Sequence, residues 1–150
     1  MAGKNYRDLG VWWEAMDFVV ECYRMTGTFP KNEVYGLASQ LQRAAVSIPA
    51  NIAEGQGRQH YKEFLQHLAI AYGSLAEVET HIQIARRLEY VRGEKENQML
   101  ERAARIGRML NGLRRSIEDK NVGRQEMKNR LPTTDYRLPQ PPETEYGAIE

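Results

Sequence analysis

The chain has 150 residues and a mass of 17.3 kDa, which is enough for one domain and a short extension. Its 21 basic and 20 acidic side chains give a net charge of +1, which excludes a histone-like polycation. The sequence has one cysteine and no apolar run near the roughly 20 residues that a bilayer requires. Its first residues also lack the apolar run of a signal peptide. We therefore expect a cytoplasmic protein without an internal disulfide, in a reducing compartment.

Apolar residues recur at spacings of three and four over four segments, which predicts helices at about 8–26, 33–54, 59–90 and 94–120. The connections between these segments are short. The pattern predicts an all-α protein, an antiparallel up-down four-helix bundle. A glycine follows each predicted helix end, as a left-handed C-terminal cap would require. Pro49 lies inside the second helix and predicts a kink, because proline removes the hydrogen bond to the carbonyl of Ala45.

The second, third and fourth helices each carry one apolar stripe that we expect to face the core. The stripes are Leu37, Leu41, Ala44, Ile48 and Ile52 on the second helix, Phe64, Leu68, Ala71, Leu75, Val78 and Ile82 on the third, and Met99, Ala103, Ile106, Leu110, Leu113 and Ile117 on the fourth.

The first helix carries two apolar stripes on different faces. One consists of Leu9, Trp12, Met16, Val19 and Tyr23, and the other of Val11, Ala15, Phe18, Cys22 and Met25. Because the core of one bundle needs a single stripe, we predict that the second set forms an interface between copies of the chain. The alternative is that the C-terminal tail or a loop of the same chain covers it. On either interpretation Cys22 is a small apolar packing residue and not a nucleophile.

Charge and proline are concentrated in the last third of the chain. Residues 102–130 carry nine basic and three acidic side chains, a net charge of +6, whereas residues 1–101 have a net charge of −2 and residues 131–150 of −3. Four of the six prolines lie at positions 132–142. We therefore divide the chain into a bundle over residues 1–120 and an extension over residues 121–150, first basic and then proline-rich and extended.

The most specific segment runs from Gln40 to Gly55 and reads QLQRAAVSIPANIAEG. It resembles the signature of the four-helix-bundle family of ribosomal-RNA intervening-sequence proteins, and supporting matches extend the resemblance over about residues 6–118. The resemblance implies small bundles that assemble into homopentameric rings, with no catalytic site. It also implies kinship with the accessory variability determinant of diversity-generating retroelements, a pentamer that binds nucleic acid and a reverse transcriptase.

Arginine donates paired hydrogen bonds to phosphate, so the basic run of the fourth helix is the candidate nucleic-acid site. The candidates are Arg102, Arg105, Arg108, Arg114, Arg115, Lys120, Arg124, Lys128 and Arg130, with Arg58, Lys62, Arg86 and Arg87 as secondary candidates. We expect the partners to be further copies of the chain, structured RNA or an RNA–DNA hybrid, and a reverse transcriptase. Two alternatives stay open: a merely solvated helix face, and a structural ring whose tail docks a partner protein.

Neither a metal site nor a catalytic site is predicted. His60, His67 and His81 are seven and fourteen residues apart, and a seven-residue interval on one helix already spans about 10 Å. Three ligands that far apart do not converge on one ion, so we interpret them as histidines at the edge of the core or at an interface. No nucleophile with a neighbouring base, phosphate loop or metal motif accompanies the glutamates. We predict a protein without catalytic residues and without a cofactor.

Overall fold

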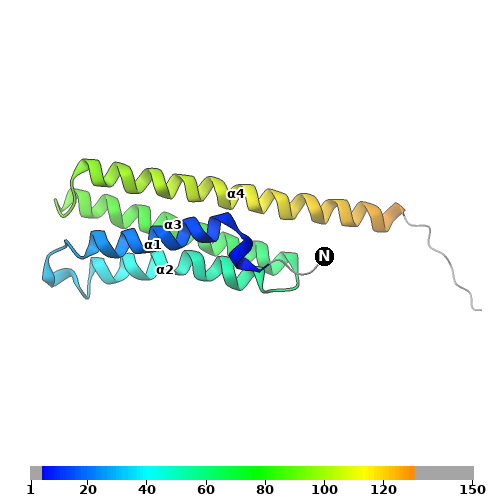
Figure 1. The fold of residues 1–150 in the computed structure, drawn as a ribbon, viewed down its shortest axis with the longest axis horizontal. Helices are drawn as coiled ribbons and strands as arrows, with labels where there is room; N and C mark the ends of the chain where they lie inside the picture. Colours follow the sequence, from blue (N-terminus) through cyan, green and yellow to red (C-terminus); the bar gives the residue numbers. More distant parts are fainter. Residues whose placement is uncertain (1–4, 131–150) are drawn as a thin grey trace, which may run out of the picture.

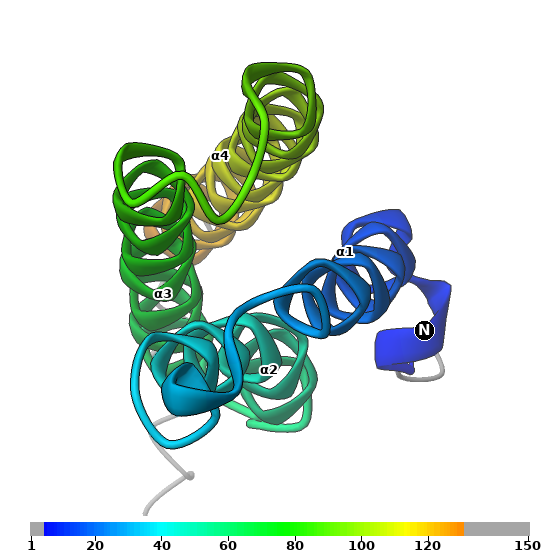
Figure 2. The same cartoon turned by 90° about the vertical axis from the view of Figure 1, so that its left-hand side faces the viewer.

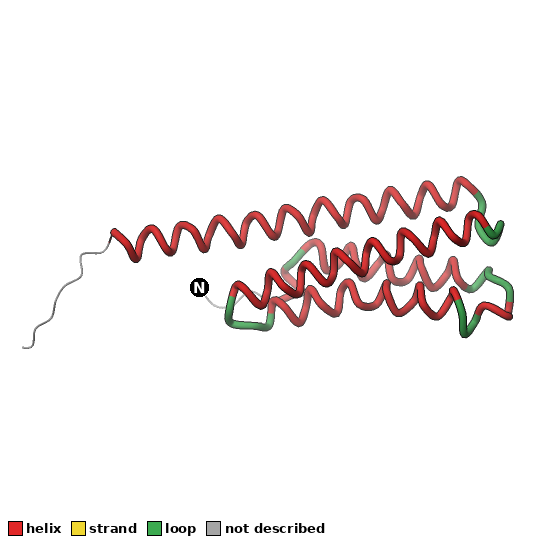
Figure 3. The backbone as a smooth tube through the Cα atoms, turned by 180° about the vertical axis from the view of Figure 1, so that it is seen from behind, coloured by secondary structure: helices red, strands yellow, loops and turns green. Residues whose placement is uncertain are grey.

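The computed structural model describes residues 5–130, which form a bundle of four helices (Figure 1). Helix α1 spans Gly10–Thr26, α2 Leu37–Gln56, α3 Tyr61–Arg87 and α4 Gly93–Arg130. Short 3₁₀ turns at Tyr6–Asp8 and Lys31–Glu33 precede α1 and α2. Figure 3 shows helices joined by short loops, without a strand over the described range. The predicted all-α, up-down four-helix architecture is confirmed.

The helices differ in how closely they pack (Figure 2). The most extensive contact is between α2 and α3, with α1 against α2 and α4 against α3. Helices α1 and α4 meet over a much smaller area, and α1 and α3 have no backbone contact within residues 5–130. Consequently α1 and α4 are the two outer helices, each with a face turned away from the central pair.

The structure corrects the assignment of the two stripes of α1. Val11, Ala15, Phe18, Cys22 and Met25, which we predicted to face another copy, are all buried in the core of the chain itself, with exposed fractions of 0–4%. Their burial requires neither a second copy nor the C-terminal tail. The small side chains of Ala15 and Cys22 fit this crowded position between helices. The Trp12 and Tyr23 rings of the other stripe carry a polar group and lie partly in solvent.

The core stripes predicted for the other three helices are confirmed. Leu41, Ile48 and Ile52 of α2 are fully buried, as are Val78 and Ile82 of α3. On α4, Met99, Ala103, Ile106 and Leu110 are buried, whereas Leu113 and Ile117 are only partly buried and pack on the edge of the core. The core therefore thins toward the C-terminal part of α4.

The Gln40–Gly55 segment places α2 very close to α3. Helix α2 continues through the buried Pro49 as a single helix. The Asn51 side-chain amide donates to the carbonyl (2.8 Å) and the hydroxyl (2.9 Å) of Ser47. At the end of α2, a Cβ atom on Gly55 would lie 2.7 Å from the Cβ of His67. Glycine is required there because any side chain would force the two helices apart.

The expected glycine caps are wrong. Gly27 and Gly57 follow α1 and α2 with φ of −61° and −73°, and no glycine within residues 5–130 has a positive φ. The left-handed residue is Glu89, with φ of 64°, after α3. The Glu89 and Tyr90 amides donate to the carbonyls of Arg86 (3.1 Å) and Ala85 (2.9 Å), which is the Schellman pattern. These hydrogen bonds fix the turn into α4 although its left-handed residue is not a glycine.

Helix α4 is longer than predicted. It does not end near Lys120 but continues to Arg130, and its last turns extend past the other helices (Figure 1). The sequence from 121 to 130 contains one glycine, no proline and mostly good helix formers, so nothing stops the helix at the edge of the bundle. The proline-rich part predicted to be extended, residues 131–150, lies outside the described residues.

Candidate nucleic-acid interface

The basic side chains of α4 lie in two environments within the bundle. Arg108 and Arg115 are exposed and have no ion pair with any residue in the range 5–130. The Arg105 Nη2 lies 3.3 Å from the Glu14 Oε1 of α1, but 63% of the Arg105 side chain remains exposed. Arg102 is half-buried, and its charge acts on Cys22 of α1. Arg105, Arg108 and Arg115 are therefore the accessible cations of this surface, which we call the α4 basic face.

The last turns of α4 add four exposed cations beyond the bundle. Lys120, Arg124, Lys128 and Arg130 are all exposed, and the last turns of α4 extend past the other helices (Figure 1). Arg114 is exposed too, and it also lines a cavity of about 360 Å³ between α3 and α4 together with Tyr72 and Asn111. A phosphate backbone could approach the exposed part of α4 from any side.

The secondary candidates are divided between the two ends of the bundle. Arg58 and Lys62 lie at the turn between α2 and α3, at the end where α4 leaves the bundle (Figure 1). Arg58 is paired with Glu54 at 3.1 Å, while Lys62 is exposed. Arg86 and Arg87 end α3, about 35–40 Å away by the helical rise. The structure thus brings Arg58 and Lys62 to the end that carries the α4 cations, but not Arg86 and Arg87.

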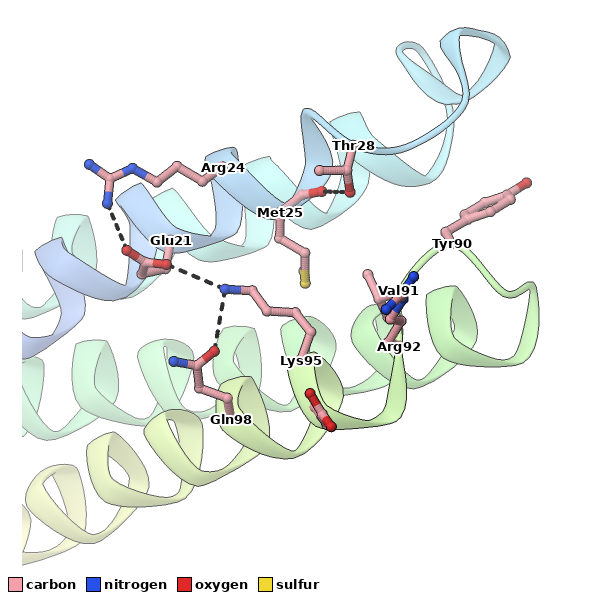
Figure 4. A pocket seen from close by; sticks show the side chains of 10 residues that line it. Glu21, Arg24, Met25, Thr28, Tyr90, Val91, Arg92, Lys95 and Gln98 are labelled. Atoms are coloured by element: carbon pink, nitrogen blue, oxygen red, sulfur yellow. Dashed lines mark hydrogen bonds and ion pairs between the residues drawn. The ribbon is translucent and has the colours of Figure 1, made fainter.

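A pocket of about 770 Å³ separates the end of α1 from the start of α4 (Figure 4). Glu21 lies between two cations, 2.8 Å from Arg24 and 3.5 Å from Lys95, and Lys95 also donates to Gln98 at 3.5 Å. Burial would raise the pKa of Glu21, but the hydrogen bond from Arg24 and the charge of Lys95 outweigh it and hold the pKa below its ordinary value. These opposite charges compensate each other, so the pocket adds less to the positive potential than the α4 basic face.

A third concavity, which the sequence did not predict, lies on the outer side of α2 and α3. It measures about 580 Å³ and is lined by Gln40, Arg43, Ala44 and Ser47 from α2 and by Ile70, Ser74, Glu77 and His81 from α3. The Ser74 hydroxyl donates to the Ser47 hydroxyl at 2.8 Å across this α2–α3 groove. Within the QLQRAAVS segment, Gln40, Arg43 and Ser47 recur at spacings of three and four. This spacing is the sequence signal that distinguishes them from the buried apolar residues of the segment.

The three predicted edge histidines differ in their surroundings. The His67 Nδ1 lies 3.0 Å from the Asn51 Oδ1, while His60 is exposed before α3. The His81 Nδ1 is fully enclosed and has no hydrogen-bond partner among the described residues. Burial lowers the pKa of His81, and the nearby Glu77 carboxylate opposes that shift. Over residues 5–130, no group of three or more histidine, cysteine, aspartate or glutamate side chains is arranged to hold a metal ion.

The one cysteine is confirmed as a packing residue. Cys22 is fully buried, and burial raises the pKa of its thiol to about 12. A thiol with that pKa stays protonated at neutral pH, which suits a packing residue and not a nucleophile. None of the helices in the described range is long and apolar enough to cross a membrane.

The fold and this set of surface residues define a helical-bundle protein with one strongly basic helix. Residues 7–112 match the sequence profile of the 23S rRNA-intervening sequence protein family, and the chain belongs to that family. The resemblance noted on the Gln40–Gly55 segment is thereby confirmed. A search of curated proteins finds no match.

The solved structures support the fold. One match is the 1.70 Å crystal structure of a protein of unknown function from the S23 ribosomal protein family of Bacteroides thetaiotaomicron. It is 23% identical in sequence, has a TM-score of 0.65, and the alignment covers 69% of this chain and 97% of that chain. At this identity the likeness establishes the bundle fold alone.

Proposed function

We propose that this protein is a non-enzymatic, homo-oligomeric accessory protein that binds structured RNA through α4. The observation that carries the proposal is the α4 basic face: Arg108 and Arg115 are exposed without an ion pair in the described range, and four further cations follow on the projecting end of the helix. The family's name associates its members with ribosomal RNA, which supports RNA as the ligand.

The binding is electrostatic and directed at phosphates. Arginine side chains that project from a helix outside any concave pocket contact the nucleic-acid backbone and read little sequence. Affinity of this kind falls steeply with salt, because each contact releases a counterion. An assembly of five copies, the number implied by the family resemblance, repeats the α4 basic face and converts weak contacts into multivalent binding. RNA–DNA hybrids present the same backbone chemistry and are candidate ligands too.

A reverse transcriptase is the protein partner that we propose for this assembly. This part of the proposal rests on the resemblance to the accessory proteins of diversity-generating retroelements. Co-purification of the protein with a reverse transcriptase encoded beside its gene would support it. The absence of such a gene from its genomic neighbourhood would contradict it.

The RNA-binding proposal is tested by titrating a labelled RNA hairpin at low and at moderate salt, with fluorescence anisotropy as the readout. We expect the Arg108→Glu/Arg115→Glu variant to bind at least about tenfold more weakly than the unchanged protein at low salt, since several backbone contacts are lost or become repulsive. The matched control is Arg86→Glu/Arg87→Glu. It makes the same charge change where α3 ends, at the end of the bundle away from the projecting turns of α4. We expect the control to stay within about threefold of the unchanged protein.

Two results would contradict the proposal. One is the absence of RNA binding by the unchanged protein at low salt. The other is an equal loss of affinity in both double variants, which would show a response to net charge and not to the α4 basic face.

A structural role without nucleic acid is the second candidate function. The observation that favours it is the exposed apolar side of α1, where Trp13, Val20 and Tyr23 are each about half exposed. In that case the ring itself is the functional unit and docks a partner protein. Two observations together would decide for this alternative. The oligomer would bind no RNA at low salt, and deletion of residues 121–150 would abolish its binding to the partner protein.

A further inference from the structure

One row of α4 changes from apolar to cationic where the helix leaves the bundle. Leu110 is buried, and Leu113 and Ile117 pack on the edge of the core. Beyond them the row continues on the projecting turns, where its side chains are all positively charged and exposed. Spacings of three and four keep these residues on one side of the helix. In order, the row consists of Leu110, Leu113, Ile117, Lys120, Arg124 and Lys128.

The acidic side chains of the projecting turns lie on other sides of α4. At about 100° per residue, the three cations stay within about 60° of the line through Ile117, whereas Glu118 lies about 100° away from it. Asp119 and Glu126 lie about 160–180° from the same line. None of the three cations has an ion pair with a residue in the range 5–130. The positive charge of these turns is therefore concentrated on the side that continues the core row beyond the end of the bundle.

The end of the bundle adds a cation from a second helix. Lys62 is exposed in the first turn of α3, at the end where α4 leaves the bundle (Figure 1). It belongs to the side of α3 that faces α4, since Ala69, seven residues further along, lines a cavity together with Arg114 of α4. Its acidic neighbour Glu63 lies about 100° further round α3. We call the corner formed by Lys62 of α3 and by Lys120, Arg124 and Lys128 of α4 the α4 step.

The α4 step suits a rigid and negatively charged rod. Its three α4 cations span about 12 Å at 1.5 Å per residue, and Lys62 contributes from a different helix. Double-stranded RNA holds its phosphates in a fixed array, so contacts to two helices at once cost it little further ordering, whereas a single strand has to be ordered first. Proteins recognise double-stranded RNA mostly by its shape and its backbone. Lysine and arginine side chains on an open surface supply contacts of that kind.

We propose that the α4 step binds the backbone of double-stranded RNA and gives the protein a preference for duplex over single-stranded RNA. The α4 basic face, with Arg108 and Arg115 on the other side of the helix, attracts any RNA backbone. The α4 step adds contacts that a rigid duplex makes with α3 and α4 together. This inference rests on the proposed RNA binding and names the class of RNA that the same helix selects.

The preference is tested with two labelled RNAs of equal length, a long-stemmed hairpin and an unstructured single strand, by fluorescence anisotropy at one low salt concentration. We expect the unchanged protein to bind the hairpin more tightly. Lys62→Glu and Arg124→Glu should each weaken hairpin binding at least about fivefold and change single-strand binding by no more than about twofold. Each variant alone should thus remove most of the preference, because the duplex needs both sides of the α4 step.

The matched controls make the same charge changes outside the α4 step. Lys31→Glu changes an exposed lysine at the opposite end of the bundle, and Arg130→Glu changes an exposed arginine about 120° round α4 from Arg124. Both controls should bind each RNA within about twofold of the unchanged protein. Equal affinity of the unchanged protein for the two RNAs would overturn the inference, as would a Lys62→Glu variant that keeps the full preference for the hairpin.

The Arg108→Glu/Arg115→Glu variant in the same titrations separates this inference from the proposed function. We expect it to weaken the binding of both RNAs by a similar factor and to leave the preference in place. A protein that binds the two RNAs equally and loses both in this variant keeps the proposed function and overturns the inference. A protein that binds neither RNA overturns both.

Discussion

The two sides of α1 have the same apolar spacing, but one side is buried and the other is exposed. The side with Phe18 lies in the core of the chain, and the side with Val20, two residues further along, is half exposed. Periodicity alone does not distinguish them, because the exposed set Trp13, Met16, Val20 and Tyr23 repeats every three or four residues just as the buried set around Phe18 does. Side-chain size and polarity do: the inner side alternates large residues with Ala15 and Cys22, and the outer side contains Trp13, whose indole Nε1 donates to the Arg7 carbonyl at 2.8 Å.

The largest expected effect is on the inner side. Phe18→Ala removes a fully buried aromatic ring and should lower the free energy of unfolding by about 3–5 kcal/mol. Val20→Ala on the outer side should change it by no more than about 0.5 kcal/mol in the dissociated chain. Guanidinium unfolding followed by circular dichroism measures both values. Similar losses in the two variants would contradict the assignment of inside and outside.

The next contrast is in thiol reactivity. Cys22 is buried with a pKa of about 12, so at pH 8 the native protein should not react with a thiol reagent, whereas the unfolded protein should react at once. Val20→Cys in a Cys22→Ala background places the thiol on the outer side and should react in the native dissociated chain. A native Cys22 that reacts as fast as the introduced cysteine would show that α1 is not held against the core.

The smallest effect is expected at the edge between the two sides. Glu14→Gln breaks the 3.3 Å ion pair with Arg105 across the seam of α1 and α4. Since both partners are partly exposed, the free energy of unfolding should fall by about 0.2–1 kcal/mol, and this difference should vanish at high salt. A loss as large as that of Phe18→Ala would mean that ion pairs, and not apolar packing, hold α1 in place.

Much of the fold could be predicted from the sequence. Four helices, their order and the core stripes of α2, α3 and α4 follow from apolar spacing, and the Gln40–Gly55 segment indicates the family. The inner side of α1 was predicted wrongly, because two stripes of equal length and spacing fit one core and the stripe predicted for the interface is the buried one. The end of α4 lies ten residues beyond the predicted end, since no tertiary contact is needed to continue a helix of good helix formers.

The candidate site was only partly predictable. The basic residues of α4 are visible in the sequence as a run, but their division into exposed Arg108 and Arg115, paired Arg105 and half-buried Arg102 depends on where α1 packs. The α2–α3 groove needs two helices to be brought together, with Ser47 opposite Ser74, a pair 27 residues apart in sequence. Spacing along one helix contains no information about that pairing.

The claim that the protein is an assembly of several copies is tested most directly by its solution mass, with Val20→Asp as the variant on the exposed apolar side of α1. The charge would be forced into an apolar contact, so we expect the unchanged protein to scatter as a multiple of 17.3 kDa and this variant as a folded chain of 17.3 kDa. Val122→Asp, at an equally exposed valine on the end of α4, should leave the mass of the assembly unchanged. An unchanged protein of 17.3 kDa, or a Val20→Asp variant that keeps the full assembly, would contradict the account.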